Sequence, residues 1–406
     1  MSSLLILQKI LFSFIIFYNG NENNNMKNND INIALLPRGI NDLLEEKSFQ
    51  ESFLSQSLMN IFKLNGYEKV SPPLIEFEEN YTLFLDTTNN QNIFRITDPI
   101  SNKPMYIRND ITPQIARIAS KKLYEDDKII RLSYIGDVLR PKGSQLHPER
   151  QIKQAGIELY GAPSVSGAIE VISTGIQALA EVNISNLIID ITMPNLTNLI
   201  LKNSKLNEQE IKLAKSYLKV KNIKKIETIP NCGKLLSKIA DSAGENDRAL
   251  NKLYKIDLPP KAKKLIKEIS LICDKIKNLH PKVNITIDPI ENRGFNYYTG
   301  IGFAIFSSNV KRELGFGGEY IVELNGKKET GMGLSILFDG LLRATQFKDE
   351  QKRILVPYKN NSNILPELRK NGWITIVSHN NKLKDIEEAK TYKCSYILKG
   401  DEIKKI

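Results

Sequence analysis

Residues 292–300 (Asn-Arg-Gly-Phe-Asn-Tyr-Tyr-Thr-Gly) place a guanidinium, that of Arg293, beside aromatic rings that include Tyr298. A guanidinium pairs with a carboxylate, and aromatic rings form the walls of small-molecule pockets. The segment therefore suits a loop that lies over a small ligand carrying a carboxylate. An ordinary aromatic-rich turn leading into a strand is the alternative interpretation.

A second group of charged residues lies in the segment 106–117. Arg108 and Asp110 are two residues apart, so their side chains share a face of an extended chain. Thr112 and Pro113 then predict the start of a helix. The simplest interpretation is a capped helix with a surface ion pair.

A third group combines two arginines with an amide and a carboxylate. Arg140 and Arg150 flank a loop that contains His147, and Gln154 and Glu158 follow in an alternating pattern of polar and small residues. Because four residues is an even spacing, Gln154 and Glu158 share one face of a strand.

Hydrophobic periodicity, and the glycines and prolines that interrupt it, predict the elements that position these residues. Helical spacing of Phe49, Phe53, Leu58 and Phe62 predicts one long helix that ends before Gly66. Short strand-like runs then extend to residue 161, followed by a helix over 168–182 and a buried strand over 187–192.

The pattern becomes helical and lysine-rich between residues 200 and 283. Asn207 and Glu210 have capping-box spacing, and Pro259-Pro260 suits the start of the last helix of this block. Strands are expected again at 284–288 and 300–306, a glycine-rich turn at 315–318 and a helix over 335–346. Residues 353–357, 365–371 and 373–377 predict a small alternating β/α unit.

Composition excludes several classes of protein. The 406 residues include three cysteines and three histidines, all far apart, so we expect neither a disulfide framework nor a metal site. The formal net charge of +11 suits an anionic partner, but a lysine-rich composition explains it equally well. The apolar stretch within residues 1–18 is interrupted by Gln8 and Lys9 and is short for a membrane span, so we expect no membrane association and interpret residues 1–34 as an extension, with Met26 as a candidate start.

The order of the three groups resembles the catalytic core of histidyl-tRNA synthetase, a class II synthetase, over residues 35–345. This resemblance implies an α+β fold: an antiparallel sheet flanked by helices, with a helical insertion and a small β/α C-terminal appendage. The expected domains are a split core at 35–199 and 284–348, the insertion at 200–283 and a C-terminal unit at 349–406. Pro73 matches the proline that lies at the dimer interface of this class.

The resemblance also implies a histidine pocket. Asp110 stands where the family has a glutamate that pairs with the ammonium group of histidine, and Arg293 and the tyrosines match side chains that close over the ligand. The residues that the resemblance assigns to histidine binding are Asp110, Thr112, Arg140, Gln154, Glu158, Arg293, Tyr298 and Tyr320.

The half of the site that binds ATP departs from the synthetase pattern. Lys142 replaces a glutamate that contacts adenine, and Gly340 replaces an arginine that faces the triphosphate. A short C-terminal unit and the run 108–117 resemble instead the regulatory subunits of ATP phosphoribosyltransferase, which are paralogues of the synthetase. That resemblance implies a non-catalytic cytoplasmic protein without cofactors, which dimerises and joins a short-form catalytic subunit in histidine biosynthesis, with histidine as effector.

Two other functions stay open. A divergent histidyl-tRNA synthetase would need another cation in place of the missing arginine, and Lys142 is the only evident candidate. A tRNA-binding module without catalysis would use the positive charge, but the short C-terminal unit makes tRNA an unexpected partner.

Overall fold

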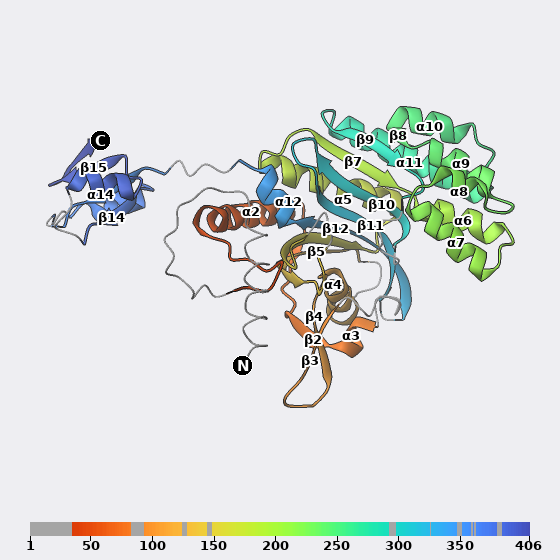
Figure 1. Ribbon diagram of the computed structural model, residues 1–406, viewed down its shortest axis with the longest axis horizontal. Coiled ribbons are helices and arrows are strands. Elements are labelled where there is room, and N and C mark those ends of the chain that lie inside the picture. The colour runs from red at the N-terminus through yellow and green to blue at the C-terminus, as the bar shows by residue number, and fades with distance from the viewer. Residues whose placement is uncertain are drawn as a thin grey trace, which may run out of the picture.

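The computed structural model describes residues 35–82, 93–123, 128–143, 148–291, 298–324, 326–346, 351–358, 360, 363–379 and 384–406 (Figure 1). In this part of the chain a mixed, mainly antiparallel sheet of nine strands forms the centre, in the order β1-β5-β6-β12-β11-β10-β7-β9-β8. Its strands are β1 (Glu68–Lys69), β5 (Ile130–Leu139), β6 (Gln151–Tyr160), β7 (Leu187–Thr192), β8 (Gly244–Glu245), β9 (Asn284–Asp288), β10 (Tyr298–Ser307), β11 (Glu313–Leu324) and β12 (Lys327–Leu337).

Helices cover both faces of this sheet. On one face, α2 (Glu45–Leu64) and α5 (Ser164–Glu181) bury Leu58, Phe62 and Val171 against the strands, and α12 (Phe338–Ala344) packs beside α2. On the other face, α4 (Thr112–Ile118) continues as one π-helical turn over Ala119–Leu123. Ile115 of this helix and Ile111, which precedes it, are buried against β5, β6 and β11. The body of the protein is therefore a sheet between two helical layers.

A small antiparallel sheet lies beside α4. Its strands pair in the order β2-β4-β3, with β2 at Ile75–Phe77, β4 at Pro104–Ile107 and β3 at Phe94–Thr97, and α3 (Glu78–Thr82) follows β2. Figure 1 shows this sheet projecting from the body below the main sheet.

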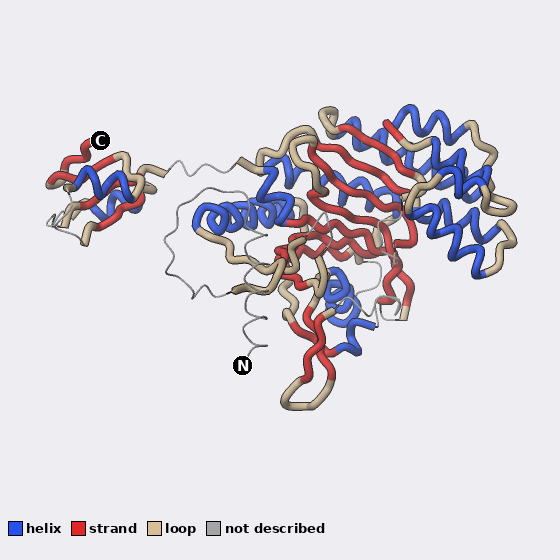
Figure 2. The backbone as a smooth tube through the Cα atoms, viewed as in Figure 1, coloured by secondary structure: helices blue, strands red, loops and turns tan. Residues whose placement is uncertain are grey.

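The lysine-rich block forms a group of helices at one end of the main sheet (Figure 2). Asn207 and Glu210 make the expected capping box, and the last helix begins at Pro260, as predicted. The helices are α6 (Pro194–Asn203), α7 (Glu208–Lys219), α8 (Ile223–Glu227), α9 (Gly233–Asp241), α10 (Asn246–Tyr254) and α11 (Pro260–Leu279).

The net charge of the chain is confined to this block. Residues 200–283 contain 20 Lys and Arg against 9 Asp and Glu, whereas the rest of the chain contains 37 of each sign. All the lysines of the block except Lys252 are exposed.

The C-terminal residues form a separate four-stranded sheet in the order β14-β13-β15-β16. Its strands are β13 (Arg353–Val356), β14 (Ile374–Val377), β15 (Tyr396–Lys399) and β16 (Glu402–Lys405), with α13 (Leu365–Lys370) and α14 (Asp385–Thr391) as its helices. Ile354 of β13 packs toward α13, and Leu355 packs toward α14, so each face has its own small core.

The fold corrects three expectations about local structure. The glycines at 315–318 lie inside β11 and not in a turn, because a Cβ at Gly317 would collide with the ring of Phe303 and the carbonyl of Gly333. These glycines therefore allow close approach of neighbouring groups. The helix expected at 335–346 begins at Phe338, since Ser335 still pairs in β12.

The third correction concerns the long helix. Helix α2 forms as predicted, but Phe49 and Phe53 point away from the core and are 71% and 49% exposed, while Leu54, Leu58 and Phe62 are buried.

In the described residues no helix is long and apolar enough to cross a membrane. The extension at 1–34 lies outside the described residues.

Candidate functional site

Glu158 is the centre of the candidate site. It lies on β6, where its neighbours across the sheet are Leu132 of β5 and Gly333 of β12, and its side chain is fully buried. A Cβ at position 333 would collide with the Glu158 carboxylate, so the glycine provides the room that this side chain needs.

Three hydroxyl groups surround the Glu158 carboxylate. Thr112 donates to Oε1 at 2.9 Å, Tyr320 donates to Oε2 at 2.7 Å, and Tyr134 lies 3.4 Å from Oε1. The hydroxyl of Tyr160 is 3.0 Å from that of Tyr320, and the two rings meet edge to face. The four groups come from α4, β5, β6 and β11, which the fold brings together.

Burial dominates the electrostatics of this group. Desolvation raises the pKa of Glu158 to about 8, although the hydrogen bonds from Tyr320 and Thr112 favour the ionised form. Burial likewise raises the pKa of Tyr134, Tyr160 and Tyr320 above the usual tyrosine value. Burial therefore favours the protonated form of Glu158 at neutral pH.

Asp110 is linked to Glu158 through an amide. Gln154 Nε2 donates to Asp110 Oδ1 at 2.8 Å and to the hydroxyl of Ser335 at 2.6 Å, and Gln154 Oε1 accepts from the backbone N–H of Ile111 at 3.3 Å. The hydroxyl of Ser335 is 2.9 Å from that of Tyr134. Because Gln154 and Glu158 share a face of β6, as predicted, both reach the same network.

The structure thus brings together five of the residues that the sequence suggests: Asp110, Thr112, Gln154, Glu158 and Tyr320. Sequence reasoning missed Tyr134, Tyr160 and Ser335, which complete the network. Tyr134 is in phase with the buried Ile130, Leu132 and Val138 along β5, and this pattern could have placed its ring on the buried face. The pairing of β6 with β12, which brings Ser335 to the network, cannot be derived from the sequence.

The remaining suggested residues lie elsewhere or outside the described part. Arg140 follows β5, where its backbone N–H donates to the carbonyl of Arg150, and within the described residues no hydrogen bond joins its side chain to the network. Tyr298 pairs with Tyr320 through the backbone, but its side chain lies outside the described residues. Arg293 and His147 also lie outside them.

Arg108 corrects the surface ion pair expected from the sequence. Its guanidinium is buried, and it donates to the carbonyls of Asp137 at 2.8 Å and Pro72 at 3.0 Å rather than to Asp110. A Cβ at Gly136 would collide with this guanidinium, so the glycine lets it cross β5. Thr112 begins α4 and Ile111 precedes it without a side-chain cap, so Thr112 is free to bind Glu158.

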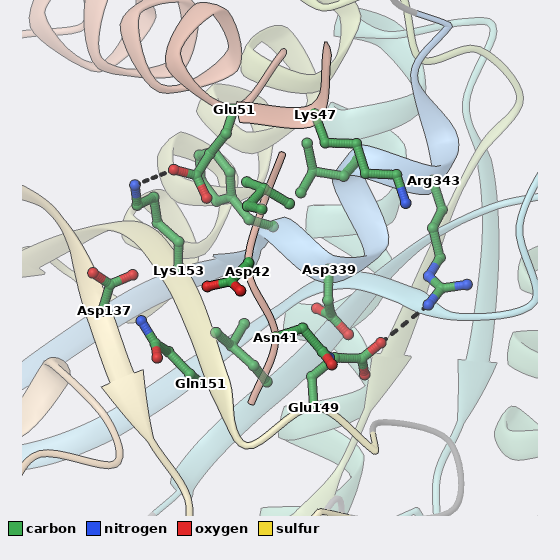
Figure 3. A pocket seen from close by; sticks show the side chains of 14 residues that line it. Asn41, Asp42, Lys47, Glu51, Asp137, Glu149, Gln151, Lys153, Asp339 and Arg343 are labelled. Atoms are coloured by element: carbon green, nitrogen blue, oxygen red, sulfur yellow. Dashed lines mark hydrogen bonds and ion pairs between the residues drawn. The ribbon is translucent and has the colours of Figure 1, made fainter. Parts of the chain in front are cut away.

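A separate cavity of about 370 Å³ opens under the N-terminal half of α2 (Figure 3). Its walls include Gln151 and Lys153, which alternate with Gln154 along β6 and therefore face away from the Glu158 network. Two ion pairs join charges of the lining: Lys153 binds Glu51, and Arg343 binds Glu149 at 3.1 Å. The lining also carries Asp42, Lys47 and Asp137, so acidic side chains outnumber basic ones around this cavity.

The structure also describes Lys142 and Gly340, the two positions at which the sequence departs from the synthetase pattern. Lys142 is exposed at the end of the described part of the β5–β6 loop. Gly340 lies in α12, and a Cβ there would be 2.8 Å from the carbonyl oxygen of Glu313. The backbone of β11 therefore occupies the place where a side chain at residue 340 would begin.

Chemically, the described network offers carboxyl groups for an ammonium, and an amide and hydroxyls for the hydrogen bonds of a polar side chain. In the described residues no cluster of three or more His, Cys, Asp or Glu side chains is placed to hold a metal ion. The arrangement is therefore suited to binding a small cationic or zwitterionic molecule.

Comparison with known families agrees with this geometry. The family model for histidyl-tRNA synthetase matches residues 39–341. The ATP phosphoribosyltransferase regulatory subunit of Rhodospirillum centenum is 36% identical over 375 residues, which cover 92% of this chain and 97% of the relative. The regulatory subunit of Paramagnetospirillum magneticum is 35% identical and covers 92% of this chain and 98% of the relative.

Solved structures show the same fold. A crystal structure described as an ATP phosphoribosyltransferase regulatory subunit/histidyl-tRNA synthetase from Bacillus halodurans has a TM-score of 0.76 at 21% identity, covering 89% of this chain and 97% of that one. Histidyl-tRNA synthetase from Nostoc has a TM-score of 0.71 at 18% identity, covering 90% and 91%. The class II synthetase fold expected from the sequence is confirmed, and the chain belongs to the histidyl-tRNA synthetase family and, within it, to the ATP phosphoribosyltransferase regulatory subunits.

Proposed function

We propose that the protein is the non-catalytic regulatory subunit of an ATP phosphoribosyltransferase and activates a separate short-form catalytic subunit in the first step of histidine biosynthesis. The observation that carries this proposal is the similarity along about 90% of the chain to relatives named as such subunits. The cytoplasm is the proposed location, and the three buried cysteines are free, as suits a reducing compartment.

The proposed effector is histidine, bound at the Glu158 network. Asp110 would pair with the ammonium group, and Glu158 and Tyr320 would bind the imidazole, since a carboxyl group and a phenol are complementary to its two nitrogens. Arg140, Arg293 and Tyr298 are the further proposed contacts, with Arg293 on the ligand carboxylate. The existing hydrogen bonds already fix Thr112 and Gln154 in place.

The absence of synthetase activity is proposed from Gly340. Adenylate formation needs a cation against the triphosphate, and a glycine supplies none. A Cβ at residue 340 would lie 2.8 Å from the carbonyl oxygen of Glu313. The packing against β11 therefore supports a glycine at this position, since a larger side chain would displace the strand.

The proposed assembly is a dimer, formed through the region of Pro73, within a hetero-oligomer that contains the catalytic subunit. Pro73 is exposed and lies beside the exposed Leu74, which supports a contact there. The proposed units are the split core at 35–199 and 284–348, the insertion at 200–283 and the C-terminal unit at 349–406.

The test is the formation of phosphoribosyl-ATP from ATP and phosphoribosyl pyrophosphate. The catalytic subunit is assayed alone, with this protein, and with this protein plus histidine. We expect activity to rise sharply only in the mixture, and histidine to lower it. An unchanged rate, together with separate elution of the two proteins in size-exclusion chromatography, would overturn the proposal.

A divergent histidyl-tRNA synthetase is the second candidate, and the match of residues 39–341 to the synthetase model favours it. Pyrophosphate exchange that depends on both histidine and ATP distinguishes the two functions. We expect none above the rate of a control without enzyme.

A further inference from the structure

The main sheet separates the cavity under α2 from the Glu158 network. Asp137 of β5 and Lys153 of β6 are neighbours across the two strands, and both line the cavity. Gln154, the next residue along β6, projects from the opposite face of the sheet and belongs to the Glu158 network. A molecule in the cavity therefore could not contact Glu158, and the cavity is a second place for a small ligand.

The size and the walls of this cavity suit a small organic molecule. Its volume of about 370 Å³ is within the usual range of small-molecule pockets, about 300–1,000 Å³. Ile152 and Phe338, which are 3% and 1% exposed, form apolar parts of the wall together with Leu43 and Leu342. Binding sites combine such apolar walls with a few polar groups that orient the ligand, so the charges of the lining decide which ligand fits.

The charges near α12 compensate one another within the chain. Glu149 pairs with Arg343 at 3.1 Å and with Arg312 at 3.2 Å, and Asp339 pairs with Arg312 at 2.8 Å. Two carboxylates and two guanidiniums therefore form one network without net charge.

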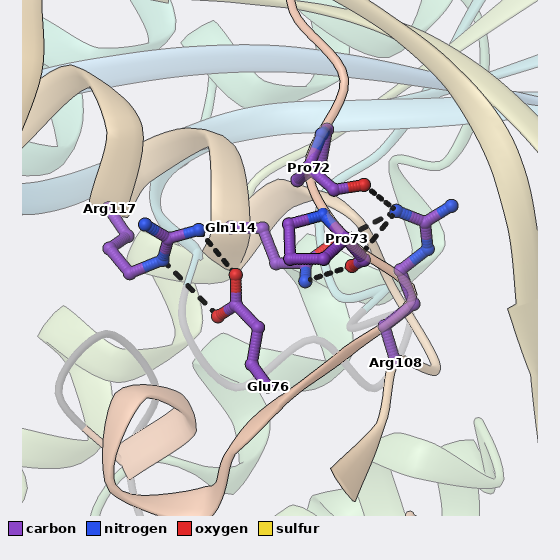
Figure 4. A network of polar contacts seen from close by, with 6 residues as sticks. All are labelled: Pro72, Pro73, Glu76, Arg108, Gln114 and Arg117. Carbon is purple, nitrogen blue, oxygen red and sulfur yellow. Dashed lines mark hydrogen bonds and ion pairs between the residues drawn. The ribbon is translucent and has the colours of Figure 1, made fainter.

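The half-buried Asp137 carries a carboxylate that the neighbouring cations do not compensate. Lys153, its neighbour across the strands, binds Glu51 instead. Arg108, whose other acceptors are shown in Figure 4, reaches β5 from the opposite face and donates to the backbone carbonyl of Asp137. Within the described residues the carboxylate of Asp137 therefore takes part in no ion pair.

Two further charges lie at the rim of the cavity. Asp42, which precedes α2, and Lys47, in the first turn of α2, are exposed, and neither takes part in an ion pair in the described part of the chain. Figure 3 shows Asp42 and Asp137 on one side of the cavity, and Lys47 with Arg343 on the other. The uncompensated charges thus form an acidic side with two carboxylates and a basic side with one ammonium group.

This distribution of charge disfavours several classes of ligand. Acidic side chains outnumber basic ones in the lining, so a nucleotide or another polyanion would be repelled. A diamine would place its second cation against Lys47. In the described residues no group of three or more His, Cys, Asp or Glu side chains is placed to hold a metal ion.

We propose that this cavity binds a small molecule that carries a guanidinium or ammonium group at one end and a carboxylate at the other. The cationic group would lie between Asp42 and Asp137, and the carboxylate would pair with Lys47. This site goes beyond the proposed function and does not depend on it, because it uses none of the residues of the histidine pocket.

The experiment is calorimetric titration of the full chain with L-arginine, L-citrulline and agmatine. L-Arginine carries both end groups, L-citrulline has an uncharged ureido group in place of the guanidinium, and agmatine lacks the carboxylate. We expect L-arginine to bind about tenfold more tightly than either analogue, because each analogue loses one charged pair.

Two variants assign the ends of the ligand. Asp137→Asn should weaken the binding of L-arginine by about tenfold and leave that of L-citrulline unchanged, because only the guanidinium needs this charge. Lys47→Gln should weaken the binding of L-arginine and leave that of agmatine unchanged. Asp42→Asn, at an exposed position before α2, repeats the first comparison if Asp137→Asn does not fold.

Asp274→Asn is the matched control. It removes the same charge from the exposed surface of α11, outside the cavity, and should change the affinity for L-arginine by less than about twofold. A loss as large as that of Asp137→Asn would show an effect of overall charge and would overturn the assignment of Asp137. Excess L-histidine should leave the affinity for L-arginine unchanged, because the two sites lie on opposite faces of the sheet.

The outcomes separate this inference from the proposed function. If L-arginine does not bind, or binds no more tightly than both analogues, the second site is overturned. If L-histidine displaces L-arginine, the ligand occupies the Glu158 pocket, and the second site falls while the proposed function stands. If L-arginine binds as expected and L-histidine does not bind at all, the proposed effector role falls and the second site stands.

Discussion

The hydroxyl of Thr112 donates a 2.9 Å hydrogen bond to Glu158, and so joins the first turn of α4 to the centre of the main sheet. The two residues are 46 positions apart in the chain. Because Glu158 is fully buried, this contact and the one from Tyr320 decide how the carboxyl group is held.

The protonation of Glu158 predicts a specific dependence of stability on pH. Burial raises the pKa in the folded protein to about 8 from 4.5, so between these values the folded state holds a proton that the unfolded state releases. The contribution of Glu158 to stability is therefore present below pH 4.5 and declines as pH rises toward 8.

Urea unfolding at pH 5.5 and pH 8 measures this effect by comparison with Glu158→Gln, whose amide does not titrate. We expect the wild type to lose more stability than the variant over this interval. Parallel losses in the two proteins would show that the Glu158 carboxyl titrates near its ordinary pKa.

Tyr320→Phe is expected to weaken histidine binding by about tenfold, because one hydrogen bond to the ligand and one to Glu158 are lost together. The unfolding free energy should fall by about 1–3 kcal/mol, since Glu158 Oε2 loses its donor in a buried place. Calorimetric titration with histidine and urea unfolding measure the two effects. Unchanged histidine affinity would remove Tyr320 from the proposed pocket.

Two glycine-to-alanine substitutions should change the free energy of unfolding in opposite directions. Gly333→Ala places a Cβ against the Glu158 carboxylate and should lower the unfolding free energy by about 1–3 kcal/mol. Gly167→Ala in α5 meets its nearest neighbour at 3.5 Å and should raise stability by about 0.5–1 kcal/mol. Thermal unfolding of both variants tests the packing, and an unharmed Gly333→Ala protein would contradict it.

Restoring an arginine at residue 340 should not restore amino-acid activation. A side chain there begins 2.8 Å from the Glu313 carbonyl, so Gly340→Arg should displace β11 and destabilise the protein. Pyrophosphate exchange with histidine and ATP should remain at background. Exchange in the variant alone would show that the glycine is the only obstacle to the synthetase reaction.

Apolar runs and helix-capping residues correctly predicted the elements that they define. The apolar run at 187–192 forms β7 with the expected limits, and the Asn207–Glu210 capping box is present. The buried role of Arg108 was not predictable, because its acceptors, the carbonyls of Pro72 and Asp137, lie about 30 residues away on either side. Ser335 was assigned to a helix for a related reason: only the register of β12 against β6 places it next to Gln154.

The uneven distribution of charge makes the protein a strong electric dipole. With 37 charges of each sign outside residues 200–283, the isoelectric point near 9.2 is a property of the helical insertion and not of the body. In an external field, or near a cation-exchange resin at low ionic strength, the molecule turns its insertion toward the negative side. Its retention on such a resin therefore depends strongly on the insertion, which carries about one third of the lysines and arginines.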